Sequence, residues 1–151
     1  MIEIEVGRGD SDEARAIVGA MEAWVQEGFG PTTPDRTSTV TPAEMVPPSG
    51  AFVIVREDGR TVAGGGIRRL ADGVCEIKRM FVRPEARGRG HGRRLLTALE
   101  QAAADLGYRV VRLDTAQSMT TAMAMYRAAG YREIPDYNGN SYASFWGEKA
   151  L

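Results

Sequence analysis

The chain has 151 residues, of which 43% are hydrophobic and 26% charged, and its formal net charge is −1. This length and composition predict one globular domain over residues 1–151 and exclude a disordered chain. Every apolar run falls short of the roughly 20 residues that cross a bilayer, so we expect no membrane partner. The acidic, alternating N-terminus is unlike a secretion signal.

One cysteine, Cys75, and one histidine, His91, are present. An internal disulfide is therefore excluded, and so are metal sites built from clusters of these residues. We expect no metal cofactor and a location in a reducing cytoplasm.

Charge is unevenly distributed along the chain. Residues 1–50 carry nine acidic and three basic residues, a net of −6, whereas residues 78–94 carry seven basic residues and one acidic residue, a net of +6. A local basic segment in a nearly neutral protein favours a small polyanion over a long nucleic acid. The alternative is a solvated basic start of a helix.

The N-terminal third predicts a strand, a helix and a loop. Apolar residues alternate with glutamate over residues 2–7, as in a half-buried strand. Capping residues at 10–12 precede a helical apolar pattern that ends at Gly28–Gly30. Five prolines in residues 31–49 predict a loop with a short helix near Pro42–Val46.

The rest of the chain alternates strands and helices. Apolar patterns between turn residues predict strands over 51–55, 61–70, 74–82, 109–114, 131–134 and 142–146. A helix is expected between Gly92 and Gly107 and another over 118–129. Three successive glycines, Gly64–Gly66, indicate a bulge or a close approach of two backbones.

This order of elements predicts an α/β fold with a mixed, mostly antiparallel sheet of about seven strands and helices on both faces. The strand over 74–82, the helix after it and the strand over 109–114 form a crossover unit. Because crossover connections join parallel strands, these two strands should be parallel neighbours.

The segment Arg87–Arg93 places glycines 88, 90 and 92 among arginines, between a strand and a helix. Unpaired N–H groups and the helix dipole attract an anion to a helix N-terminus, and glycines let a phosphate approach the backbone. The segment therefore suits a diphosphate. The dinucleotide-binding fingerprint would need a third glycine where Arg93 stands, and the Walker A ending is absent.

The same residues resemble a known family. Val82 followed by Arg87-Gly88-Arg89-Gly90-His91-Gly92 resembles the R/Q-x-x-G-x-G/A motif of the GNAT N-acetyltransferase superfamily. Downstream, Met125-Tyr126-Arg127-Ala128-Ala129-Gly130-Tyr131 is similar to the family's L-Y-x-x-x-G-F segment. Two motifs in the right order, joined by a matching β-α-β-α frame, are more specific than a lone glycine motif.

The resemblance implies that acetyl-CoA is the donor. Its pyrophosphate would bind the N–H groups of Gly88 to Gly92, His91 included, with Arg87, Arg89 and Arg93 nearby. Its pantetheine arm would lie along the main chain of Met80, Phe81 and Val82, which requires the two parallel strands to splay apart. We expect the His91 side chain to face solvent or a phosphate.

The resemblance also suggests catalytic residues. Tyr126 stands at the position of the family's usual general acid, which protonates the coenzyme thiolate. Glu76 lies on the strand where some members keep a general base, and Asp114, at the end of its strand, is the competing candidate. The alternatives are a core tyrosine and carboxylates that are solvated or paired with Lys78 or Arg112.

One position departs from the family pattern. Many relatives place an asparagine seven residues before the tyrosine, where this chain has Met119. Ser118 or Thr120 could supply the missing contact to the coenzyme.

The acceptor is less well defined than the donor. In this superfamily it sits between the N-terminal helical region and the C-terminal hairpin, here Trp24, Phe29, residues 31–49 and residues 137–146. The net charge of −6 over residues 1–50 favours a cationic small amine or polyamine, with a peptide amine as the alternative.

We therefore expect an N-acetyltransferase that acts on the primary amine of a small molecule. A non-catalytic acyl-CoA-binding domain and an RNA-binding module are the alternatives, and no nucleic acid partner is expected under the leading hypothesis. A homodimer is compatible with the sequence.

Overall fold

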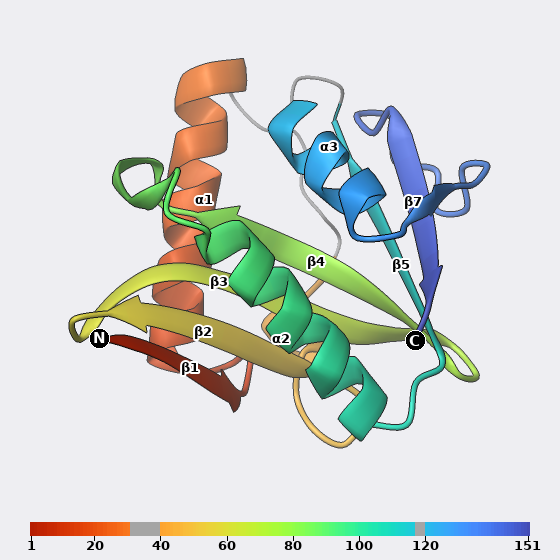
Figure 1. Cartoon of the computed structure of the whole chain (residues 1–151), viewed down its shortest axis with the longest axis horizontal. Coiled ribbons are helices and arrows are strands. Elements are labelled where there is room, and N and C mark those ends of the chain that lie inside the picture. Colours follow the sequence, from red (N-terminus) through yellow and green to blue (C-terminus); the bar gives the residue numbers. More distant parts are fainter. Residues whose placement is uncertain (31–39, 117–119) are drawn as a thin grey trace.

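The computed structural model in Figure 1 describes residues 1–30, 40–116 and 120–151. Seven strands form a single sheet in these residues, in the order β1-β2-β3-β4-β5-β7-β6. The predicted mixed, mostly antiparallel sheet is thereby confirmed. The strands are β1 (Ile2–Gly7), β2 (Ala51–Glu57), β3 (Arg60–Ala71), β4 (Val74–Val82), β5 (Val110–Thr115), β6 (Arg132–Glu133) and β7 (Phe145–Ala150).

The described helices lie on both faces of the sheet. Figure 1 shows α1 (Asp12–Phe29) behind it, and α2 (His91–Asp105) and α3 (Thr120–Ala128) in front. Two short 3₁₀ helices, η1 (Pro42–Glu44) and η2 (Pro84–Ala86), complete the described elements. Ser118 and Met119, which bear on the departure from the family pattern, lie outside the described residues.

Local chemistry explains where the two long helices begin and end. The Ser11 side chain accepts the Ala14 N–H at 3.1 Å at the start of α1, and Gly30, with φ of 82°, follows its last residue. Gly90, also with φ of 82°, stands at the N-cap of α2. Left-handed φ values favour glycine, so Gly30 marks the end of α1 and Gly90 marks the start of α2.

Strands β1 to β4 form an antiparallel meander, and β4 and β5 pair in parallel. The parallel ladder runs only from Val74–Val110 to Glu76–Arg112. Beyond this point the two strands diverge toward the N-terminal end of α2 (Figure 1). The predicted parallel pair is therefore confirmed, and it opens at one end.

Two apolar clusters cover the two faces of the sheet. The larger cluster joins α2 and α3 to strands β2 to β5, and includes Leu95, Leu99 and Leu113. The smaller cluster joins α1 to the other face through Ile17 and Phe52. Because the clusters are separate, each apolar side chain on β4 packs either with α2 and α3 or with α1.

The Gly64–Gly66 run provides both a bulge and a close approach. The β3–β4 register shifts between Gly64 and Gly66, and Arg79, opposite this region on β4, has a φ of 58°. A Cβ added at Gly64 would lie 2.8 Å from Ile17 Cγ2 and from a Phe52 ring carbon. Glycine therefore lets α1 pack directly on the sheet.

The last strand differs from the prediction, because it begins at Phe145 and not at Tyr142. The Asn140 carbonyl accepts the Ala143 N–H at 3.1 Å, and the Asn140 side chain accepts the Tyr142 N–H at 3.1 Å. This turn holds residues 140–144 outside the ladder. Among the helices that the structure describes, none has the length and apolar character needed to cross a membrane.

Candidate active site

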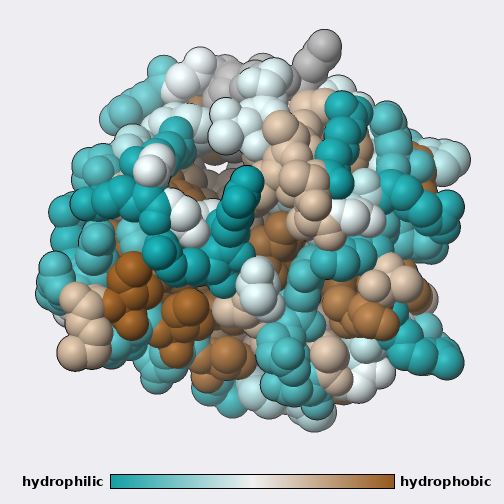
Figure 2. Space-filling view, viewed as in Figure 1, coloured by the Kyte–Doolittle hydropathy of each residue, from teal (hydrophilic) through white to brown (hydrophobic). Residues whose placement is uncertain are grey.

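The divergence of β4 and β5 creates an opening in the middle of the sheet. After Glu76, β4 has no paired residue on β5, so its main-chain groups from Ile77 to Val82 form no ladder with that strand, although the Val82 carbonyl accepts from Arg87. Figure 2 shows the molecular surface hollowed at this end, beside the N-terminus of α2. The predicted path for the pantetheine arm, Met80 to Val82, lies along this free edge.

The glycine segment forms an exposed loop that leads into α2. Gly88 and Gly90 both have φ of 82°, and the first helical hydrogen bond runs from the Arg94 N–H to the Gly90 carbonyl at 3.2 Å. The N–H groups of His91, Gly92 and Arg93 therefore precede the helical ladder. Together with the helix dipole they suit an anion.

The arginines of this segment have different roles. Arg87 donates to the Val82 carbonyl at 3.0 Å and lies 4.6 Å from the centre of the Trp24 ring, while Arg94 donates to the Arg89 carbonyl at 2.7 Å. These contacts brace the loop. The side chain of Arg93 is exposed, so its charge can reach a phosphate directly.

His91 is buried, so the solvent-facing alternative is wrong. Its side chain has no exposed surface, and its Nε2 lies 3.5 Å from Glu57 Oε2. Arg89 also binds Glu57, at 3.0 Å. The ring of His91 is thus enclosed, and its main-chain N–H, which precedes the helical ladder, is the group that remains for an anion.

Tyr126 and Met80, which are 46 positions apart in the sequence, meet at the opening. The Tyr126 hydroxyl lies 3.5 Å from Met80 Sδ, and the side chain is 94% buried. Burial raises the pKa of Tyr126, and the charge of Asp114 adds to the effect. The phenol is thus held in its protonated form at neutral pH, as a proton donor requires.

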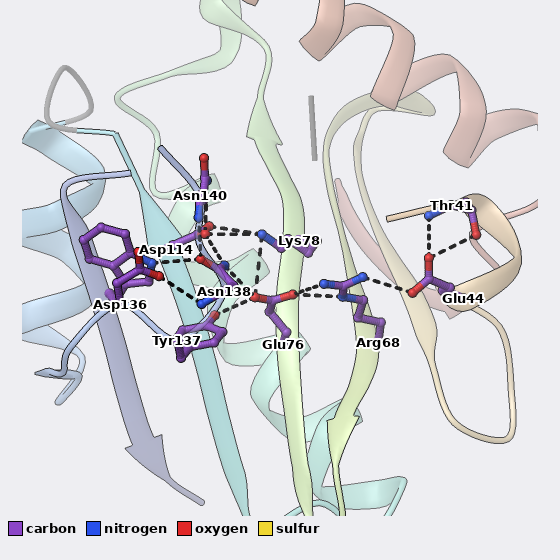
Figure 3. A network of polar contacts seen from close by, with 11 residues as sticks. Thr41, Glu44, Arg68, Glu76, Lys78, Asp114, Asp136, Tyr137, Asn138 and Asn140 are labelled. Atoms are coloured by element: carbon purple, nitrogen blue, oxygen red, sulfur yellow. Dashed lines mark hydrogen bonds and ion pairs between the residues drawn. The ribbon is translucent and has the colours of Figure 1, made fainter. Parts of the chain in front are cut away.

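Glu76 lies on the opposite face of the sheet from Met80 and has no exposed surface. Arg68 donates to its Oε1 at 2.9 Å, and Tyr137 and Asn138 donate to its Oε2 at 2.6 and 3.2 Å. Lys78 Nζ lies 3.6 Å from Oε2. Figure 3 shows these side chains converging on Glu76 from β3, β4 and the loop before β7.

Asp114 lies across the opening from Glu76 and is also enclosed. Its carboxylate receives Lys78 at 3.3 Å, Asn138 at 2.5 Å and Asn140 at 3.1 Å. Arg112, suggested as a partner for these carboxylates, instead pairs with Glu148 at 2.9 Å. Both candidate bases therefore share Lys78 and Asn138.

The polar side chains that surround Glu76 and Asp114 belong to a longer polar row, which continues from Glu76 toward the segment before β2. Arg68 also binds Glu44 at 3.0 Å, and Glu44 accepts the Thr41 N–H at 3.0 Å. Burial opposes ionisation of Glu44, but the hydrogen bonds from Thr41 and Arg68 outweigh it and lower its pKa. The row thus extends across the sheet from the loop before β7 to η1 (Figure 3).

Sequence reasoning missed Arg68, and it named residues 137–146 as part of the acceptor region without linking Tyr137, Asn138 and Asn140 to the two carboxylates. They come from β3 and from the loop before β7, and no local motif links them to Glu76. Alternation along β3 and β4 could have placed Arg68 opposite Glu76, since the two residues are register partners.

Comparisons with known proteins agree with this geometry. A family model described as the acetyltransferase (GNAT) family matches residues 18–131. An uncharacterised N-acetyltransferase of Schizosaccharomyces pombe is 33% identical over 101 residues, which are 62% of this chain and 59% of that protein. The chain spans a little over half the length of the curated relatives it matches.

Solved structures match over the whole chain. A crystal structure of a candidate acyl-CoA N-acyltransferase from Klebsiella pneumoniae superposes with a TM-score of 0.77 at 27% identity, covering 100% of this chain and 98% of that one. The PaiA N-acetyltransferase of Thermoplasma acidophilum, crystallised with coenzyme A, has a TM-score of 0.73 at 18% identity, with coverage of 100% and 99%. The second likeness concerns the fold alone.

Proposed function

Because this chain belongs to the GNAT acetyltransferase family, we propose that it transfers an acetyl group from acetyl-CoA to the primary amine of a small molecule. The observation that carries the proposal is the meeting of Tyr126 and Met80 at the opening between β4 and β5. A proton donor there would stand beside the free edge of β4, where the coenzyme's thioester is expected to lie.

The donor site follows from the glycine loop and the free strand edge. The residues proposed to hold acetyl-CoA are Met80, Phe81, Val82, Arg87, Gly88, Arg89, Gly90, His91, Gly92, Arg93 and Tyr126. The loop presents the N–H groups of α2 to the pyrophosphate, and the β4 edge offers main-chain hydrogen bonds to the pantetheine amides. Membership of the GNAT acetyltransferase family supports this choice of donor.

Tyr126 is the proposed general acid. Attack of a neutral amine on the thioester gives a tetrahedral adduct, whose collapse expels the coenzyme as a thiolate. A protonated phenol beside the sulfur supplies the proton that this leaving group needs. Burial raises the pKa of Tyr126, so the phenol is protonated when the thiolate forms.

Glu76 is the proposed proton acceptor for the attacking amine. Arg68 and Lys78 form ion pairs with its carboxylate and hold it at the end of the opening. Asp114 is the alternative, on the other side of the opening. The two share Asn138, so a proton taken by either alters the charge felt by the other.

The proposed acceptor is a small amine, with a peptide amine as the alternative. The net charge of −6 over residues 1–50 favours a cationic acceptor. We also propose a reducing cytoplasm as its location, in line with the single cysteine in the sequence, Cys75. Burial raises the pKa of that thiol to about 12.

Isothermal titration with acetyl-CoA tests the donor, with ATP, NAD and a short RNA as controls. We expect saturable one-to-one binding of acetyl-CoA alone. Thiol release is then followed with a panel of amines (spermidine, tyramine, glucosamine and a short peptide), and mass spectrometry identifies the acetylated product. Binding of acetyl-CoA without turnover of any amine would favour the non-catalytic alternative, and no binding by the folded protein would reject both.

A further inference from the structure

Glu76 cannot meet an acceptor directly, because its side chain has no exposed surface. If this carboxylate receives the amine proton, a group already bound to it must transmit that proton. Four side chains contact the carboxylate in the described part of the chain, which are Arg68, Lys78, Tyr137 and Asn138.

These four groups differ in whether they can both donate and accept a proton. The Arg68 guanidinium and the Asn138 amide nitrogen donate hydrogen bonds but accept none. Lys78 forms ion pairs with two carboxylates, those of Glu76 and Asp114, and an ammonium has no lone pair with which to accept a proton. The Tyr137 hydroxyl alone both donates and accepts, so it alone of the four can give one proton and take another.

The loop before β7 fixes Tyr137 in place. Asp136 accepts the N–H groups of Asn138 and Gly139 at 2.9 and 2.7 Å, which closes a turn directly after the tyrosine. The Arg112 guanidinium lies 5.4 Å from the centre of the Tyr137 ring. The hydroxyl is thus held 2.6 Å from Glu76 Oε2, and the side chain is only partly buried (Figure 3).

We propose that Tyr137 is a further catalytic residue, a relay that carries the amine proton from the acceptor to Glu76. The N–H bond of the attacking amine breaks as its proton binds the phenolic oxygen. At the same time the original phenolic O–H bond breaks, and the phenolic proton binds Glu76 Oε2. The adduct nitrogen loses its positive charge, Glu76 becomes a neutral acid, and Tyr137 is neutral before and after the step. This inference rests on the proposed function.

The electrostatics of the site suit a relay that never ionises. Burial, and then the charge of Glu76, raise the pKa of Tyr137, so a free phenolate is disfavoured. The phenol therefore exchanges one proton for another in a single step. After the product leaves, Glu76 returns its proton to water by the same route, because Tyr137 is the partly exposed end of the pair.

The first test compares Tyr137→Phe with the wild type and with Tyr108→Phe. The control also loses one hydroxyl hydrogen bond, to the Ser49 carbonyl at 2.5 Å, beside the closed end of the β4–β5 pair. With the panel amine that has the highest kcat/KM, Tyr137→Phe should lower the kcat/KM for the amine about 100-fold. The Kd for acetyl-CoA should stay within about twofold, and Tyr108→Phe should keep wild-type kinetics.

The second test asks whether Tyr137 acts through Glu76. Each of Tyr137→Phe and Glu76→Gln should slow transfer, and the double variant should be no slower than the slower single variant, because one route is removed twice. Thermal unfolding checks that each variant folds. If Glu76→Gln fails to fold, Glu76→Asp takes its place, since it keeps the charge but shortens the reach to the hydroxyl.

Three results would overturn the relay. Wild-type kcat/KM in Tyr137→Phe would show that the hydroxyl carries no proton. Fully additive losses in the double variant would show that the two residues act independently. An equal loss of amine turnover and acetyl-CoA affinity would indicate a structural role. A wild-type protein that acetylates no amine would instead reject the proposed function, and the relay with it.

Discussion

Lys78 and Asp114 face each other across the gap that opens where β4 and β5 stop pairing, with Lys78 Nζ 3.3 Å from Asp114 Oδ1. The last backbone pair of the two strands, Glu76 with Arg112, lies just before this gap. An ion pair between largely buried groups thus continues the connection where the backbone ladder ends. The separation of the strands is set here by side chains, which allows main-chain groups of β4 to remain available to a ligand.

The glycine loop offers the most direct test of the donor site. Gly90 has φ of 82°, and a β-branched residue in that conformation costs about 1–3 kcal/mol. Gly90→Val would therefore distort the loop and crowd the anion site. We expect acetyl-CoA affinity, measured by calorimetry, to fall about tenfold or more.

A matched control separates loop distortion from general strain. Gly107, at the other end of α2, has φ of 95°, and a Cβ there would meet no atom within 4 Å. Gly107→Val should lower the melting temperature comparably and leave acetyl-CoA affinity unchanged. Equal affinity in Gly90→Val and the wild type would remove the loop from the donor site.

Tyr126→Phe tests the general acid. The change keeps the ring, which packs edge-on against Tyr131 at 5.9 Å, and removes only the hydroxyl. We expect kcat for thiol release to fall about 100-fold while acetyl-CoA affinity changes little. Turnover at the wild-type rate would mean that water or another group protonates the thiolate.

Glu148 provides a pH-dependent contribution to stability. The hydrogen bond from Arg112 lowers its pKa despite partial burial, and Arg132 adds to the effect. A lowered carboxyl pKa stabilises the fold above the ordinary value of 4.5, and that stabilisation is lost as the pH falls through the folded-state pKa. At pH 7, Glu148→Gln should lower the free energy of unfolding by about 1–2 kcal/mol.

The difference between Glu148→Gln and the wild type should then narrow below about pH 4.5 in denaturant unfolding. Glu133→Gln serves as the control, because its pair with Arg127 is well exposed and such pairs contribute little. A difference in the free energy of unfolding between Glu148→Gln and the wild type that stays constant from pH 7 to pH 3 would contradict the ionic explanation.

Gly64→Ala tests the close approach of α1 to the sheet. The added Cβ would lie 2.8 Å from Ile17 and Phe52, so packing must shift, at a cost of about 1–3 kcal/mol in the free energy of unfolding. Gly19→Ala, in the middle of α1 with open space around it, should instead stabilise the protein by about 0.5–1 kcal/mol. Thermal or denaturant unfolding distinguishes the two signs.

The sequence predicts the order and bounds of the strands and helices better than it predicts the side-chain contacts of the polar row. Alternation and turn residues define β1 and β4 with the bounds observed. The expected half-burial of β1 is wrong, because Ile2, Ile4 and Val6 are 38%, 45% and 55% exposed. The start of β7 is misplaced, since Asn140 forms a turn where aromatic residues favour a strand. Apart from Lys78 on the same strand, the partners of Glu76 lie 8 to 62 positions away in the sequence, and only tertiary pairing brings them to it.

The bulge at Arg79 has a consequence for engineering the strand. Cys75 and Ile77 pack on the side of α2, whereas Phe81, beyond the bulge, packs on the side of α1 and Met80 turns toward α2. The extra residue inverts the odd–even pattern midway, so Ile77 and Met80, three positions apart, both face α2. Deleting Arg79 would restore simple alternation while leaving Met80 on the side of α2 and Phe81 on the side of α1, so the strand would lose its bulge and one residue of length but keep the faces of both side chains.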